Sequence, residues 1–298
     1  MFETLEMIEN SIVSYADAMK IVAGDVQNFQ ADGYKQSRYS FVSIFQAQIA
    51  KYGASSAQTP GASHSQQISQ GVVLLPLGLD FTQGGLRAGG PLNVAVSGNG
   101  LFVLKPENLT DHIYTRASDF VFGSDGSLID SFGRRVMGYQ YVNGKLDKSK
   151  LVAIKVDPTK YDVNDLGFES NGILTSNYSA RKLASSQSST DGTKTNVPAG
   201  EQLFQIGLAN IPNPSGLSPY VGNTYRTNLN SGDVAAFGVS NDTGLGTVSG
   251  ASIESSNVNP AEVSIVGIQL QRGYNAVQGA LTMINKMLSS FMSVVEKA

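Results

Sequence analysis

The chain has 298 residues, enough for about two domains, with 21 basic and 24 acidic side chains and a net charge of −3. It contains no cysteine and two histidines, which excludes disulfides, thiol catalysis, zinc–thiolate sites and multi-histidine metal sites. The charge balance argues against nucleic-acid binding through a basic surface. The sequence contains no run of about 18 apolar residues, so it predicts no membrane-spanning helix. Its acidic start, Met1–Glu6, does not resemble a secretory signal peptide.

An apolar seam follows the N-terminal region. Its members alternate in steps of three and four residues, the period of a coiled coil. They are Leu5, Ile8, Ile12, Tyr15, Met19, Val22, Val26 and Phe29. The pattern predicts a helix over residues 1–32 that ends near Gly33, because glycine readily adopts the left-handed conformation after a last helical turn.

A second seam follows the C-terminal region and contains one additional four-residue step. Its members are Val263, Val266, Leu270, Tyr274, Val277, Leu281, Ile284, Leu288, Phe291 and Val295. Asn259 as a cap, Pro260 at the first helical position and Glu262 three residues after the cap predict where the helix begins. The helix also contains Gly267, Gly273 and Gly279. Because glycine leaves room for a neighbouring backbone, we expect close helix–helix packing there.

From Phe81 to Ile253 the pattern favours strands. Four Asn-Gly or Asp-Gly pairs, typical of tight hairpin turns, separate short apolar runs. They are Asn99-Gly100, Asp125-Gly126, Asn143-Gly144 and Asn171-Gly172. The expected strands include residues 92–96, 101–104, 151–156 and 203–209. We predict an α+β fold in which paired, long, coiled-coil-like terminal helices flank a mostly antiparallel β domain.

The expected domains are discontinuous. Residues 1–35 and 257–298 form a helical core domain, residues 36–70 an extended linker, and residues 71–256 the β domain. Residues 53–70 and 184–200 are polar, nearly uncharged and poor in bulky side chains, which is typical of loops.

The two predicted helices lack long helical neighbours in the sequence. Helices of this kind are stabilised mainly by packing, so we expect them to pack against other copies of the chain. Heterologous contacts of this kind build open helical assemblies. The expected self-assembly interface is Ile8, Ile12, Tyr15, Met19, Val22, Val26, Phe29, Val266, Leu270, Tyr274, Val277, Leu281, Ile284, Leu288 and Phe291.

The residues that catalysis would need are poorly placed. His64 and His112 lie in predicted loops without a Gly-x-Ser-x-Gly motif nearby. A hydrolase acting on the cell wall would need an acidic pair. The candidates Asp80, Asp119, Asp125 and Asp130 are better explained as turn or surface residues. We expect no enzymatic activity, cofactor or metal site.

Four stretches, in order along the chain, resemble the axial rod and hook proteins of the bacterial flagellum. The first is Asp32–Lys35 with Arg38 and Phe41; the second is Asp80–Gly84 with Gly90–Phe102; the third is Tyr114–Arg116 with Phe120 and Asp125–Leu128; the fourth is Ser256–Asn259 with Gln271–Asn275. The motif residues are Gly33, Tyr34, Lys35, Asn257, Val258, Asn259, Gln271 and Arg272. The sequence differs from the family pattern at residues 23–28 and at Ser118.

The resemblance implies a self-assembling structural subunit of a hollow helical tube. It implies type III export without a cleaved signal and location in the periplasmic rod of the basal body. It also implies other rod and hook subunits, ring or bushing proteins and the export apparatus as partners. The stretch from Phe41 to Gly71 is long, and Gln58–Ser63 within it resembles the extended stretch typical of distal rod subunits, which favours that kind of subunit. A hook subunit and another rod subunit remain open.

Overall fold

The computed structural model describes residues 2–43, 72–107, 109, 111–178 and 200–296, which form two compact units. His64 and the loops expected at 53–70 and 184–199 lie outside the described residues. The helical unit contains residues 1–27, 37–78 and 259–298, and the β unit contains residues 28–36 and 79–258. These bounds differ from the expected domains, because residues 28–36 belong to the β unit and the described parts of 37–78 belong with the helices.

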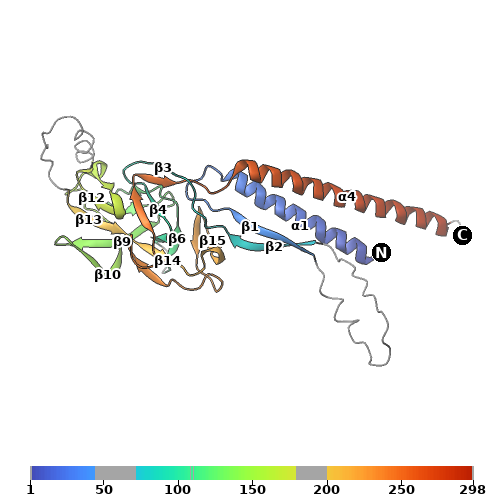
Figure 1. Ribbon diagram of the computed structural model, residues 1–298, viewed down its shortest axis with the longest axis horizontal. Coiled ribbons are helices and arrows are strands. Elements are labelled where there is room, and N and C mark those ends of the chain that lie inside the picture. Colours follow the sequence, from blue (N-terminus) through green and yellow to red (C-terminus); the bar gives the residue numbers. More distant parts are fainter. Residues whose placement is uncertain (1, 44–71, 108, 110, 179–199, 297–298) are drawn as a thin grey trace, which may run out of the picture. The chain divides into compact units, whose positions relative to one another are not determined.

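The helical unit contains helices α1 (Phe2–Gln27) and α4 (Pro260–Glu296), which lie side by side (Figure 1). At about 1.5 Å per residue they are roughly 39 and 55 Å long. Strands β1 (Ser37–Ser43) and β2 (Val72–Leu79) pair as a two-stranded ribbon. Two long helices beside a largely antiparallel β unit confirm the expected α+β class.

The beginning of α4 confirms the predicted cap. The Ala261 N–H donates to the Asn259 side-chain oxygen over 3.1 Å, and the Val263 N–H donates to the Asn259 carbonyl over 3.0 Å. Pro260 occupies the first helical position, where its missing N–H has no intrahelical partner to lose.

The predicted end of α1 is wrong, because the helix stops at Gln27 and residues 28–33 form turns. The Gly33 N–H donates to the Glu254 carbonyl over 2.8 Å, so it is not available to a continuing helix. Gly33 has a φ of +63°, and a Cβ there would lie 2.3 Å from the Ala117 nitrogen. A long-range contact therefore determines this conformation, and Phe29 lies beyond the helix.

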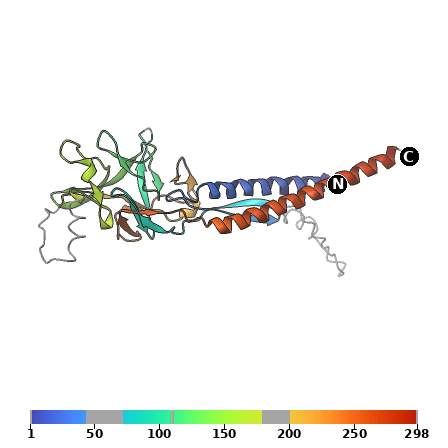
Figure 2. The same ribbon diagram turned by 90° about the horizontal axis from the view of Figure 1, so that it is seen from above.

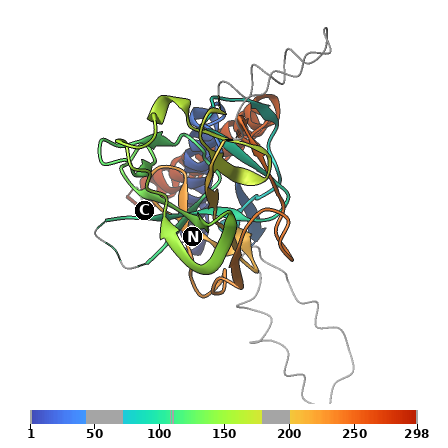
Figure 3. The ribbon, with the colours of Figure 1, turned by 90° about the vertical axis from the view of Figure 1, so that its left-hand side faces the viewer.

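The strands of the β unit are short, and every pairing between them is antiparallel (Figures 1 and 3). They are β3 (Leu86–Ala88), β4 (Val94–Ser97), β5 (Leu101–Lys105), β6 (Ile113–Thr115), β7 (Val121–Phe122), β8 (Leu128–Ile129), β9 (Arg135–Val142), β10 (Lys145–Ala153), β11 (Gly167–Phe168), β12 (Ile173–Thr175), β13 (Gln202–Ile206), β14 (Leu208–Asn210), β15 (Ser218–Pro219), β16 (Thr224–Arg226), β17 (Ala236–Gly238), β18 (Thr247–Gly250) and β19 (Ser252–Glu254). Three short 3-10 helices are η1 (Val163–Asp165), η2 (Ser170–Gly172) and η3 (Pro214–Gly216).

The main sheet has the order β11-β12-β13-β9-β5-β6-β16-β15, with β7, β8, β10, β14 and β17 attached. Two further pairs, β18-β4 and β19-β3, join the end of the β segment to its beginning. The unit is thus closed by strands that are far apart in the sequence.

Three of the four predicted hairpin turns are confirmed. Asp125-Gly126 connects β7 and β8, Asn143-Gly144 connects β9 and β10, and Asn171-Gly172 connects β11 and β12. The hairpin predicted at Asn99-Gly100 is wrong, because β4 pairs with β18 while β5 pairs with β6, β9 and β14. The Asn99 carbonyl instead accepts a hydrogen bond from the Gly246 N–H over 2.6 Å.

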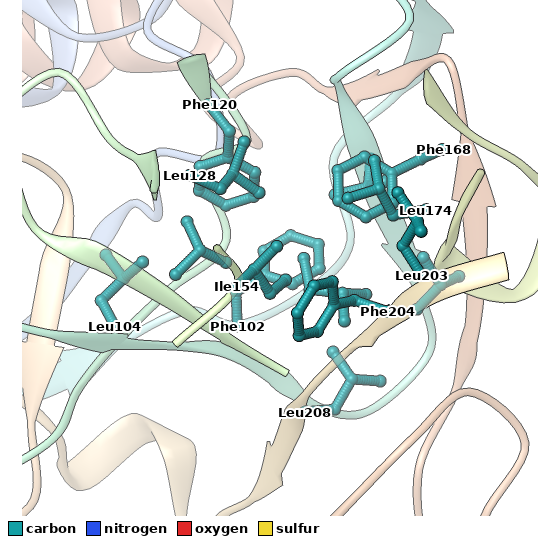
Figure 4. Close-up of a cluster of buried hydrophobic side chains, with 14 of the residues drawn as sticks. Phe102, Leu104, Phe120, Leu128, Ile154, Phe168, Leu174, Leu203, Phe204 and Leu208 are labelled. Carbon is teal, nitrogen blue, oxygen red and sulfur yellow. The ribbon is translucent and has the colours of Figure 1, made fainter. Parts of the chain in front are cut away.

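The interior of the β unit is apolar. In Figure 4, Phe102, Ile154 and Phe204 lie close together in a cluster supplied by several strands. Phe102 and Phe120 meet edge to face, with ring centroids 5.7 Å apart. The other labelled members are Leu104, Leu128, Phe168, Leu174, Leu203 and Leu208. This core holds together strands that are distant in the sequence and so positions the loops between them.

Candidate functional site

The N-terminal seam is only partly covered in the single chain. Ile8 and Val22 are buried, whereas Val26 and Phe29 are exposed. Leu5 is also exposed, and the remaining members, Ile12, Tyr15 and Met19, are half-buried. The seam therefore has apolar surface left over after α1 has packed within its own unit.

Two serines on α1 form part of a buried face that the seam analysis missed. The Ser14 hydroxyl donates to the Val72 carbonyl over 2.9 Å, and the Val72 N–H donates to the Ser11 hydroxyl over 3.3 Å. Both hydroxyls also donate to the carbonyl four residues earlier in α1. These bonds join β2 to a second side of α1, so an apolar period alone does not identify every buried position.

The C-terminal seam becomes more exposed along α4. Val263 and Leu270 are buried, whereas Leu288 is 42% and Phe291 is 62% exposed. The seam members between them are half-buried: Val266, Tyr274, Val277, Leu281 and Ile284. Figure 2 shows the reason, because the last turns of α4 extend past the beginning of α1.

The three glycines of α4 differ in what they contact. A Cβ on Gly273 would lie 2.5 Å from a ring carbon of Tyr15, so the expected close packing is confirmed there. A Cβ on Gly267 would lie 3.5 Å from the Val22 side chain, which is ordinary contact. No described atom lies within 4 Å of a Cβ on Gly279, so the expected close helix–helix packing is wrong there. The contacts Tyr15–Gly273 and Val22–Gly267 also show that the helices run antiparallel.

A buried charge cluster lies in the β unit. Lys35 Nζ is 2.6 Å from Glu254 Oε1, and both side chains are fully buried. Arg116 Nη1 is 3.0 Å from the second carboxylate oxygen, Oε2. The Gly84 N–H also donates to Oε1 over 3.1 Å, and Lys35 donates to the Thr82 carbonyl over 2.7 Å. One carboxylate therefore joins two cations and a loop amide.

The second positive charge of this cluster is offset by backbone carbonyls. Arg116 donates to the Val96 carbonyl over 3.1 Å and to the Gly98 carbonyl over 2.6 Å. Burial lowers the pKa of Lys35, and the neighbouring Glu254 carboxylate opposes that shift. The cluster is a structural ion pair in a dry interior, where removing one member leaves a buried charge without its partner.

Asn257 connects the same segments through its amide. Its Nδ2 donates to the Asp80 carbonyl over 2.7 Å, and its Oδ1 accepts from the Gln36 N–H over 2.8 Å. The Asn257 N–H in turn donates to the Tyr34 carbonyl over 3.4 Å. An aspartate at this position would keep the acceptor but lose both donors.

The structure thus brings together residues from all four motif stretches: Gly33 and Lys35, Thr82 and Gly84, Arg116, and Asn257. Val258 is also buried, whereas Asn259 is the cap of α4 and belongs to the helical unit. Gln271 and Arg272 are exposed on α4 and lie outside the cluster. Sequence analysis missed Glu254. The signal available in the sequence was Glu254 itself, a single acid two residues before the Ser256–Asn259 motif in a stretch with few charges.

The acidic candidates for catalysis have structural partners. The Asp125 carboxylate accepts hydrogen bonds from the Ser127 N–H and hydroxyl, which lower its pKa. Asp130 pairs with Arg134, with Arg134 Nε 2.6 Å from Oδ2. The described residues contain no group of three or more acidic or histidine side chains suited to a metal ion. None of the described helices is long and apolar enough to cross a membrane.

Comparison with known proteins gives full-length and partial similarities. The chain is 26% identical over 285 residues to the flagellar basal-body rod protein FlgG of Bacillus subtilis, covering 94% of both chains. It is 24% identical over 269 residues to FlgG of Borreliella burgdorferi, covering 90% of this chain and 89% of that protein. It is 31% identical over 134 residues to the flagellar hook protein FlgE of Helicobacter pylori, covering 45% of this chain and 16% of the hook protein. No family model matches the chain.

Two long terminal helices, and a β unit in which four motif stretches meet at one charge cluster, agree with the resemblance to the axial proteins of the flagellum. The full-length relatives of the chain are flagellar basal-body rod proteins, and its partial relatives include flagellar hook proteins.

Proposed function

We propose that this chain is a subunit of the distal rod, where it polymerises into a hollow helical tube that transmits torque and encloses the export channel. One observation carries the assignment. The rod-protein similarity extends over about nine-tenths of the chain and of the relatives, whereas the hook similarity covers less than half of the chain.

The helical seams are the proposed self-assembly surface. In the tube, the terminal helices form the inner layer with coiled-coil-like packing between copies, and the β unit forms the outer layer. The apolar side chains left exposed on α1 and α4 support this assignment, because large exposed apolar surfaces are typical of interaction sites.

We also propose the specific partners that the family resemblance implies. The chain leaves the cell through the flagellar export apparatus without a cleaved signal. It then contacts neighbouring rod and hook subunits and a ring or bushing protein. The role is structural, not enzymatic, as it is in the relatives.

Electron microscopy of basal bodies from a strain that lacks this gene tests the distal-rod assignment. We expect a truncated rod without outer rings and without a hook, restored when the gene is supplied on a plasmid. A complete rod with rings but no hook would instead identify a hook subunit, the alternative favoured by the partial similarity to FlgE.

The seam assignment has its own test. Ile284→Asp places a charge on a half-buried apolar position and is expected to abolish swimming and incorporation into basal bodies. Thr282→Asp, two residues earlier and exposed, is the control and is expected to keep both. Normal swimming of the Ile284→Asp strain would contradict the seam assignment.

A further inference from the structure

A groove lies between α1 and β2 within the helical unit. Its volume is about 520 Å³, and its apolar lining includes Val13, Ile21, Val73 and Leu74. Val13 is 53% exposed and Val73 is also exposed, so no residue that the structure describes fills the groove. Two carboxylates, Glu9 and Asp17, also line it.

An apolar face without a partner lies at the other end of the helix pair. Met283, Met287, Phe291 and Val294 follow one another at spacings of four, four and three residues, which places them on one side of α4. All four are more than half exposed. The exposed Lys286 lies at the edge of this face, next to Met287.

Residues 283–294 cannot fill the groove of their own chain. They belong to a continuous helix that packs against α1 and then extends past its beginning (Figure 2). The groove, in contrast, faces β2 and is lined by α1 residues from Glu9 to Ile21. The two surfaces are therefore available to different copies at the same time.

We propose that residues 283–294 of one copy bind in the α1–β2 groove of a second copy of this chain. Met287 and Phe291 occupy the apolar floor, and Lys286 lies against the Glu9 carboxylate, because Asp17 already pairs with Lys20 over 2.8 Å. The inferred contact identifies the surface to which the exposed end of α4 binds during self-assembly. The inference rests on the proposed function. Because the two surfaces differ, the contact is heterologous, and each copy keeps one free groove and one free helix end for further growth.

The charges of the two elements support this choice of occupant. Helix α1 carries five acidic side chains and one lysine. Between its terminal acids Glu262 and Glu296, α4 carries only the cations Arg272 and Lys286. Complementary charge of this kind directs one surface toward another and disfavours contact between two copies of α1.

The absence of cysteine permits a direct test in assembled flagella, because introduced thiols have no native competitor. Val13→Cys and Met287→Cys are combined in one chain, and isolated basal bodies are treated with a short bis-maleimide. We expect cross-linked dimers and higher multimers from the double variant and none from either single variant.

Val13→Cys combined with Ile268→Cys is the matched control, because Ile268 is 52% exposed on α4 but lies outside residues 283–294. It is expected to give no multimers. The proposed contact is overturned if the Val13/Met287 strain swims and its basal bodies contain the protein but no cross-link forms. Absence of the unmodified chain from basal bodies would instead refute the proposed function.

A charge reversal tests the contact without new thiols and covers the case in which the double cysteine variant does not assemble. Lys286→Glu is expected to reduce incorporation into basal bodies at least several-fold, and adding Glu9→Lys is expected to restore it. Incorporation of Lys286→Glu at the unmodified level, or no recovery in the reciprocal variant, would overturn the proposed contact.

Discussion

The charge cluster of the β unit and the outer surface of the helical unit contrast in what they bury. The first buries charged side chains, and the second leaves apolar side chains exposed. In the cluster, Glu254 has both oxygens engaged, and Lys35 and Arg116 share it while donating to backbone carbonyls. On α4, Met283, Phe291 and their neighbours remain exposed although they are apolar. The first region pairs its charges within a single chain, although the buried Arg116 Nε has no hydrogen-bond partner among the described residues. The second region leaves apolar surface that no described residue covers.

For the proposed polymer subunit, this contrast separates the region stabilised within one chain from the region that contacts other copies. A region whose buried charges are paired internally needs no neighbour to offset those charges. A region with exposed apolar surface is stabilised when a neighbour covers that surface, by about 25 cal/mol for each Å² removed from water. In the proposed polymer, the contacts between copies are therefore concentrated in the terminal helices.

The largest effect is expected from Glu254→Ala, which leaves two buried cations without their carboxylate. Breaking a buried pair in this way costs about 3–5 kcal/mol of unfolding free energy. Urea unfolding of the full chain, followed by tyrosine fluorescence because the chain has no tryptophan, measures the change.

The control for this variant is Glu107→Ala, which removes an exposed partner of Arg135. That pair is solvated on both sides, and its loss is expected to cost less than about 1 kcal/mol. Equal losses in the two variants would show that the buried cluster contributes no more than a surface pair.

Tyr114 predicts how the β unit responds to alkaline pH. Burial, followed by the charges of Asp111 and Asp233, raises its pKa from 10.0 to about 12. The folded state therefore retains a proton that the unfolded state loses, so the stabilisation is present below pH 10 and is lost as the pH rises toward 12. Two pKa units correspond to about 3 kcal/mol.

Tyr114→Phe removes this titrating group. The unfolding free energy of the variant is expected to fall between pH 10 and pH 12 by about 2 kcal/mol less than that of the unmodified chain, because part of the total lies outside this interval. Identical pH profiles, measured by urea unfolding at both pH values, would contradict the assignment.

Gly273→Val tests the packing within the helical unit. The new side chain meets the Tyr15 ring and is expected to cost about 1–3 kcal/mol, as overpacking does. Gly279→Val is the matched control, because its position is open. It is expected to change stability by a few tenths of a kcal/mol, since valine has the higher helix propensity. Thermal unfolding followed at 222 nm compares them, and a larger loss for Gly279→Val would reverse the conclusion.

The smallest effect is expected at the turn between β9 and β10. Asn143 and Gly144 have φ values of +51° and +73°, and nothing described lies within 4 Å of a Cβ on Gly144. Gly144→Ala therefore tests backbone strain alone and is expected to cost about 1 kcal/mol. Gly85→Ala, at an equally open position without positive φ, is expected to be neutral or slightly stabilising. A stabilised Gly144→Ala chain would contradict this.

Local features were readable from the sequence. The Asn259-Pro260 cap and the Asn143-Gly144 turn involve atoms only a few residues apart, so their hydrogen bonds and dihedral angles follow from the residue types themselves. The seams likewise predicted both long helices, because a repeating apolar step describes a helix face wherever the helix lies.

Partnerships between distant residues depended on the tertiary structure. Lys35 and Glu254 are 219 positions apart, and Arg116 and Glu254 are 138 positions apart. The partner of β4 also depended on the tertiary structure, because β4 pairs with β18 instead of forming the hairpin predicted at Asn99-Gly100. The end of α1 at Gln27 is a further example. No local pattern contains this information, because burial and charge pairing depend on which segments the fold brings together. The amino-acid pattern was thus sufficient to predict both long helices, three of the four hairpin turns and the resemblance to rod and hook proteins. The folded arrangement was needed to identify the residues of the charge cluster and the apolar surfaces that stay exposed on the single chain.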